Sequence, residues 1–141
     1  MPTDPLENLA RIGQLDKVPF SADLMARMLA TADARLQDAQ RLDNSTETRF
    51  DCAYTAIRAI ADAALLKHGF RTSTSRPGHH QTTLQCLAHT LGLSAPDVRL
   101  LDSLRKQRNL SDYDGELLTQ ESLAECIRQA QRLQALARQQ L

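Results

Sequence analysis

The segment from 46 to 69 constrains the fold of this chain more than any other. It follows a cluster of helix-capping residues, "DNST" at 43–46, and ends at Gly69, the residue type that commonly follows the last turn of a helix. Apolar and small side chains cover most of its circumference: Phe50, Ala53, Tyr54, Ile57, Ile60, Ala61, Ala64 and Leu65 on one face, with Cys52, Ala56, Ala59 and Ala63 beside them. A helix that is apolar on several sides needs neighbours on several sides. We therefore predict that it is the central helix of a bundle.

The rest of the chain repeats the same three-four periodicity, and no alternating run of β-branched residues competes with it. A chain of 141 residues is long enough for one hydrophobic core. We therefore predict a single all-α domain over residues 1–141, an up-and-down bundle of five to six helices. The expected landmarks are a first helix over Leu6–Leu15, later helices capped by Ser21, Ser94 and Thr119, and a short fourth helix that ends at Gly92.

The charges balance over the whole chain but not along it. Lys plus Arg and Asp plus Glu both number 17, so overall charge gives no attraction to nucleic acid or to an acidic membrane. Between Ala63 and Pro96 there is no acid, although three basic residues and all four histidines lie there. From Asp112 to Glu125 there are five acids and no base. A neutral chain with a basic middle offers a place for an anion.

The cysteines and the N-terminus bear on location. Cys52, Cys86 and Cys126 are single, odd in number and set among apolar residues, which is typical of buried free thiols in a reducing compartment. The opening "MPTDPLENLARIG" has no basic region followed by an apolar run, and no stretch is apolar for the length of a membrane span. We expect a cytoplasmic protein without a membrane segment.

One polar stripe crosses the central helix, and it is a candidate site. Asp51, Thr55, Arg58 and Asp62 follow three-four spacing on an otherwise apolar helix. Arg108 continues the core-facing stripe of Val98, Leu101 and Leu104, so it should also face inward. An inward guanidinium must be paired or must line a wet cleft. The pairing acid would be Asp51, Asp62 or Asp112; in the alternative, Arg58, Arg108, Asn109 and Tyr113 line a groove in which two arginines bind a phosphate.

These residues also carry a resemblance. A helical bundle with "RN" at the end of a late helix, followed within a few residues by His or by "DY", resembles the HEPN superfamily of prokaryotic helical domains. The matching string is "RNLSDYDG", with Arg108, Asn109, Asp112 and Tyr113 at the motif positions. The segment "RFDCAYTAIRAIADAALLKHGFR" is similar to the long central helix of the family, and by order of elements the resemblance covers Ser21 to Ala137.

The resemblance implies a homodimer, often encoded beside a nucleotidyltransferase or within a toxin–antitoxin pair. Active members have the pattern RxxxxH and cleave RNA without metal, whereas this chain has Tyr113 at the histidine position. Proton transfer to and from RNA needs groups of near-neutral pKa, and tyrosine has a pKa of about 10. We therefore expect binding rather than cleavage. In some family systems a tyrosine near this motif accepts a nucleotide, so Tyr113 is a candidate acceptor; otherwise its ring packs on the bundle.

The histidines leave further alternatives open. His79 and His80 are expected to cap the fourth helix, or to add partial charge to the basic groove. They are also the candidate proton-transfer groups if the chain is a ribonuclease after all. Cys86 and His89 are ligand types that zinc prefers, but no CxxC accompanies them, so we predict neither a metal site nor a cofactor.

Three hypotheses result. The first is an HEPN-like domain that binds RNA, a nucleotide or a nucleotidyltransferase partner through Arg58, Arg108, Asn109, Asp112 and Tyr113, with Asp51 and Asp62 beside them. The second is a metal-independent ribonuclease toxin that uses Arg108 with His79 or His80. The third is a dimerisation module without a ligand, in which basic and acidic segments pair between subunits.

Overall fold

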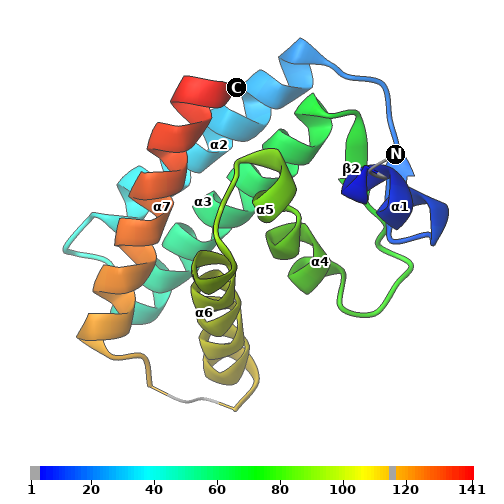
Figure 1. Ribbon diagram of the computed structural model, residues 1–141. Coiled ribbons are helices and arrows are strands. Elements are labelled where there is room, and N and C mark those ends of the chain that lie inside the picture. The colour runs from blue at the N-terminus through cyan, green and yellow to red at the C-terminus, as the bar shows by residue number, and fades with distance from the viewer. Residues whose placement is uncertain (1–3, 115–116) are drawn as a thin grey trace.

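The computed structural model describes residues 4–114 and 117–141, and for 112–114 only the backbone. The chain is mostly helical (Figure 1). The helices are α1 (Pro5–Arg11), α2 (Ala22–Ala39), α3 (Thr46–Lys67), α4 (His79–Gln85), α5 (Leu87–Thr90), α6 (Ala95–Asp114) and α7 (Gln120–Gln140). Two short strands, β1 (Leu15–Lys17) and β2 (Phe70–Thr72), complete the fold.

Helix α3 is the centre of the molecule, as its composition predicts. It packs against α2 and α7 along its length and against α4, α5 and α6 on its other side (Figure 1). Twelve of its 22 residues are buried. Ser45 caps its start by accepting a hydrogen bond from the Thr48 amide, and Gly69 follows its end with a φ of 86°. Local capping chemistry and an apolar circumference therefore specify this element together.

The other predicted helix starts are also confirmed. Ser21 accepts from the Leu24 amide at the start of α2, and Thr119 accepts from the Ser122 amide at the start of α7. Ser94 accepts from the Asp97 amide at 3.3 Å, which caps α6. Leu101 and Leu104 of the predicted core-facing stripe of α6 are buried, and so are Leu123, Ala130 and Leu133 of α7.

Three predicted boundaries differ from the structure. The first helix ends at Arg11 rather than Leu15, because Gly13 takes a φ of 83° that a helix cannot continue. The fourth helix is divided at Cys86 into α4 and α5. The string "DYDG" at 112–115 is typical of a turn, but the backbone of α6 stays helical through Asp114, so Asp112 and Asp114 belong to its last turn.

The strands were not predicted. β1 pairs antiparallel with β2 in the register Leu15↔Thr72, Asp16↔Arg71 and Lys17↔Phe70. The pairing fixes the N-terminal segment to the end of α3, where a second apolar cluster forms from Leu6, Leu15, Leu65, Phe70 and Cys86. This arrangement holds residues 18–28 beside α3 and β2, which matters for the site below.

Candidate functional site

Arg108 turns inward from α6 onto α3, as its position in the apolar stripe predicts. Its Nε donates a hydrogen bond to Asp51 Oδ1 at 2.6 Å, and its guanidinium lies 5.2 Å from the centre of the Tyr54 ring. Asp51 is thus a pairing acid for Arg108, on the predicted polar stripe. The Arg108 side chain is 25% exposed and that of Asp51 49%, so the pair lies at the edge of the core, within reach of water.

Tyr54 is the residue of this cluster that sequence reasoning assigned only to the core. Its side chain is 1% exposed, and its hydroxyl has no hydrogen-bond partner in the described part of the chain. Burial raises the pKa of this phenol, while the charges of Arg108, Arg58 and Arg105 oppose the rise. The signal in the sequence was its position three residues after Asp51, which places it on the helix face that α6 covers.

Further along α3, Arg58 and Asp62 continue the polar stripe. Arg58 is half-buried and makes no ion pair or side-chain hydrogen bond with the described residues. Burial raises the pKa of the Asp62 carboxyl to about 6, although the nearby charge of Arg58 acts in the opposite direction. A desolvated acid with a near-neutral pKa beside a cation is a common feature of binding and catalytic sites.

Arg58 and Asp62 line a cleft of about 520 Å³ enclosed by α2, α3, β2 and α4, which we name the α2–α4 cleft. Its apolar wall includes Val18, Leu24, Met28, Leu66 and Phe70. Its polar lining includes Arg58, Asp62, Arg71, Thr72, His79, His80 and Thr83. The cleft therefore combines side chains from segments that are distant in the sequence, and the strand pairing is what brings the 18–28 segment to it.

The structure corrects the predicted role of the histidines. His79 and His80 are the first two residues of α4, and the cap residue is Gly78, which has no side chain to offer. The two imidazoles instead meet edge to face with centroids 4.4 Å apart. Burial, then the charges of Arg58, His79, Arg108 and Arg105, lower the pKa of His80 to about 4. At neutral pH His80 is thus uncharged and adds no positive charge to the groove.

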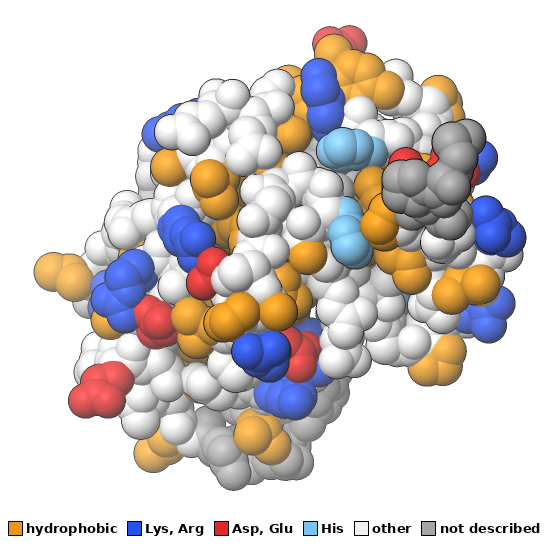
Figure 2. Space-filling view, viewed as in Figure 1, with side chains coloured by type: hydrophobic (Ala, Val, Ile, Leu, Met, Phe, Trp, Pro, Cys, Tyr) orange, Lys and Arg blue, Asp and Glu red, His pale blue; other side chains and the backbone are white. Residues whose placement is uncertain are grey.

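The remaining predicted site residues are distributed as follows. Asn109 is half-buried on α6 next to Arg108. The backbone of Asp112 and Tyr113 lies in the last turn of α6, but their side chains fall outside the described residues, so the motif is described only at Arg108 and Asn109. Figure 2 shows acidic and basic side chains interspersed over one face of the molecule rather than gathered into an area of one sign.

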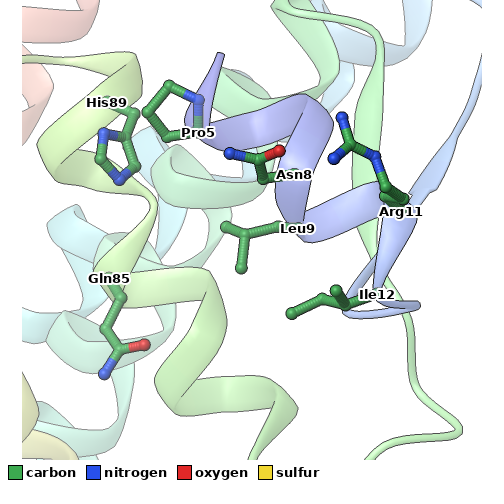
Figure 3. Close-up of a pocket in the computed structure, with 7 residues that line it drawn as sticks. All are labelled: Pro5, Asn8, Leu9, Arg11, Ile12, Gln85 and His89. Atoms are coloured by element: carbon green, nitrogen blue, oxygen red, sulfur yellow. The ribbon is translucent and has the colours of Figure 1, made fainter. Parts of the chain in front are cut away.

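The cysteine and histidine pair considered as metal ligands is separated. Cys86 is fully buried in the second apolar cluster, and burial raises the pKa of its thiol to about 11. His89 is exposed and lines a different hollow of about 420 Å³ between α1 and the α4–α5 region, with Asn8 and Arg11 (Figure 3). Among the described residues, no group of three or more His, Cys, Asp or Glu side chains is arranged to hold a metal ion.

The fold is that of a helical domain with a partly apolar, arginine-lined cleft. No family model matches the sequence, and no curated protein matches it. Within the described residues, no helix combines the length and apolar character needed to cross a lipid bilayer.

Proposed function

We propose that this chain is an HEPN-like domain that binds a phosphate-bearing ligand, RNA or a nucleotide, or a nucleotidyltransferase partner, through the groove formed by Arg58, Arg108 and Asn109. The observation that carries the proposal is Arg58. A half-buried guanidinium that makes no ion pair with the described residues leaves its donors available for an external anion.

Arg108 supports the same proposal in a different way. Its Nε is engaged by Asp51 and its plane lies over Tyr54, so the guanidinium is held in a fixed orientation. Its charge acts together with that of Arg58 on both Tyr54 and His80. An anion bound at Arg58 would therefore be attracted by two cations, one on α3 and one on α6.

The proposed state is a homodimer in a toxin–antitoxin or nucleotidyltransferase pair. In that role this chain binds its ligand or its partner protein, and the partner carries out the catalytic step. The support is the motif "RNLSDYDG" together with an inward Arg108 and a central small-residue helix. Tyr113 is then the residue that a partner would modify.

A ribonuclease is the second candidate, and the position of His80 near three arginines favours it. The charges of Arg58, Arg105 and Arg108 all act on this imidazole, so it lies in their electrostatic neighbourhood. A neutral imidazole can accept a proton, which Arg108 cannot. A pKa of about 4 makes His80 a weak base at neutral pH, and this argues for binding over cleavage.

The test is incubation of total RNA with purified protein in EDTA, together with RNA binding at low and moderate salt. Wild type is compared with Arg58→Ala, Arg108→Ala and the control Arg41→Ala, an exposed arginine that is paired with Asp43 on the α2–α3 loop. We expect no cleavage, binding that weakens as salt rises, and loss of binding in the two groove variants only.

Two other results would change the function. Cleavage by wild type that is lost in Arg108→Ala and in His80→Gln would establish the ribonuclease. The other result is that both groove variants bind RNA, nucleotide and partner as wild type does, while Arg108→Ala melts at a much lower temperature. Arg108 would then serve only in a structural ion pair, and the dimerisation module would be the remaining hypothesis.

A further inference from the structure

The α2–α4 cleft has the dimensions of a small-molecule pocket. Its volume of about 520 Å³ lies within the range of roughly 300–1,000 Å³ that is typical of ligand sites. Four separate segments wall it: residues 18–28, the α3 residues Arg58 to Leu66, β2 with the residues after it, and the first turns of α4. Walls on several sides suit a compact ligand better than a polymer, which needs an open groove.

The apolar wall is not filled by the protein itself. Leu24 and Met28 lie on the apolar stripe of α2, yet they stay only half-buried, whereas Ala32, Leu36 and Ala39 further along the same stripe are buried. Leu24 and Met28 therefore face the cleft rather than the core. Leu66 and Phe70 form the opposite wall from α3 and β2. An apolar ligand body of the right size would cover this surface.

The polar lining gives the cleft a preference for an anionic group. Arg58 supplies a guanidinium without an ion pair among the described residues. The Thr72 and Thr83 hydroxyls are engaged with each other at 2.7 Å, and Thr83 donates to the His79 carbonyl, so the polar contacts left for a head group come from Arg58 and from His80, a neutral donor or acceptor. Asp62 partly offsets this positive charge, because a carboxyl with a pKa of about 6 is still mostly ionised at neutral pH.

We propose that the α2–α4 cleft binds a small amphipathic anion, a carboxylate or phosphate monoester whose apolar body lies against Leu24, Met28, Leu66 and Phe70 and whose head group contacts Arg58. This goes beyond the groove function, since Arg58 is the one residue common to both sites. It needs neither a dimer nor a nucleic acid.

The test is isothermal titration calorimetry of the full chain with octanoate, octyl phosphate and, as a neutral probe, octanol. Wild type is expected to bind one equivalent of an anion and to prefer it to octanol. Arg58→Gln removes a charge-assisted contact and should weaken anion binding roughly tenfold while octanol binding is unchanged. The two anions identify the head group: preference for octanoate indicates a carboxylate, and preference for octyl phosphate a phosphate.

Met28→Trp is the second variant, because a larger side chain on the apolar wall fills the cleft. It should abolish binding of every probe, and circular dichroism with a melting curve reports whether the variant remains folded. Leu42→Ser is the matched control: Leu42 is 85% exposed and lies on the α2–α3 loop, away from the cleft lining, so binding should be unchanged.

The outcomes separate this proposal from the groove function. Arg108 does not line the cleft, so Arg108→Ala should leave octanoate binding intact even where RNA binding is lost. The proposal is overturned if neither anion binds at millimolar concentration, or if binding persists unchanged in Arg58→Gln. Binding that folded Met28→Trp retains in full would also overturn it, since the ligand would then lie elsewhere.

Discussion

Two contacts of Arg108 hold its side chain in position, and each contributes little to stability. Its ion pair with Asp51 is partly solvent-exposed, so screening limits it to about 0–1 kcal/mol. The contact with the Tyr54 ring adds about 0.5–1 kcal/mol. Each of these two contacts is small beside the total stability of a domain, so we expect Arg108→Ala to stay folded, which a melting curve of the variant checks.

Tyr54 carries an unsatisfied polar atom in the core, and its removal should be favourable. Tyr54→Phe keeps the ring beneath Arg108 but deletes a buried hydroxyl without a partner among the described residues. Such an atom carries a desolvation penalty of about 1–3 kcal/mol, part of which the variant should recover. Urea unfolding is expected to show Tyr54→Phe as stable as wild type or up to about 1 kcal/mol more stable. A loss of more than that would mean that the hydroxyl is engaged.

Asp62 makes stability depend on pH in a defined direction. Burial raises its pKa from 3.8 to about 6, so the folded state holds the proton more tightly than the unfolded state. The ionised carboxylate is fully penalised above about pH 6, and the penalty disappears as the pH falls towards 4. Asp62→Asn should therefore stabilise the domain at neutral pH, by at most about 3 kcal/mol, and this advantage should vanish in acid.

The measurement is urea unfolding of wild type and Asp62→Asn between about pH 4 and pH 8. His80 titrates with the opposite sign, because its pKa is lowered to about 4 and its protonation below its ordinary value of 6.5 destabilises the fold. Subtracting the wild-type curve from that of the variant removes this contribution to first order. An advantage for Asp62→Asn that grows in acid would contradict the assignment.

At the scale of single residues, the sequence predicted which way a side chain faces better than which residue it contacts. The three-four spacing of Val98, Leu101 and Leu104 was enough to predict that Arg108 faces inward. Which acid would pair with it stayed open, because the choice depends on how α6 is placed against α3. The contact with Tyr54 and the position of His80 in the α2–α4 cleft were missed for the same reason.

At the scale of helices and strands, features set by local sequence could be predicted, whereas the long-range pairing of the strands could not. Helix caps at Ser21, Ser45, Ser94 and Thr119 could be predicted because each depends on a hydrogen bond within three residues. The strands β1 and β2 are three residues each and far apart in the chain, so neither has a periodicity that a sequence window can detect. The α2–α4 cleft depends on that pairing and could not be predicted either.

Gly69 lies between the central helix α3 and strand β2, and substitutions can test whether its backbone conformation requires glycine. Its φ of 86° is one that alanine adopts only with strain, while an added Cβ would meet Val18 O at an ordinary contact distance of 3.5 Å. Gly69→Ala should therefore destabilise the domain through backbone strain, by about 1–2 kcal/mol, in thermal or urea unfolding. Gly69→Asn is the control: asparagine tolerates this region better, so it should lose less. Equal losses in both variants would point to crowding instead.

At the scale of the whole molecule, two exposed leucines bear on self-association. Leu117, just before α7, is 87% exposed, and Leu110 on α6 is 40% exposed. Both lie close in sequence to the Arg108 motif, at whose interface the proposed homodimer would form. Single exposed leucines are common on protein surfaces, so it is their proximity to the motif that makes this surface the one to test as a dimer interface.

If the homodimer closes over apolar surface, sedimentation equilibrium should show it surviving high salt, because screening weakens ion pairs and leaves apolar burial intact. Leu117→Ser should then raise the dimer dissociation constant, roughly tenfold for the loss of one buried leucine contact. Leu42→Ser, equally exposed at 85% but on the α2–α3 loop, should leave it unchanged. A dimer that dissociates at high salt and is unaffected by Leu117→Ser would instead be held by the basic and acidic segments, the arrangement expected of the dimerisation module. A protein that is monomeric at every concentration would remove the homodimer from the proposed function.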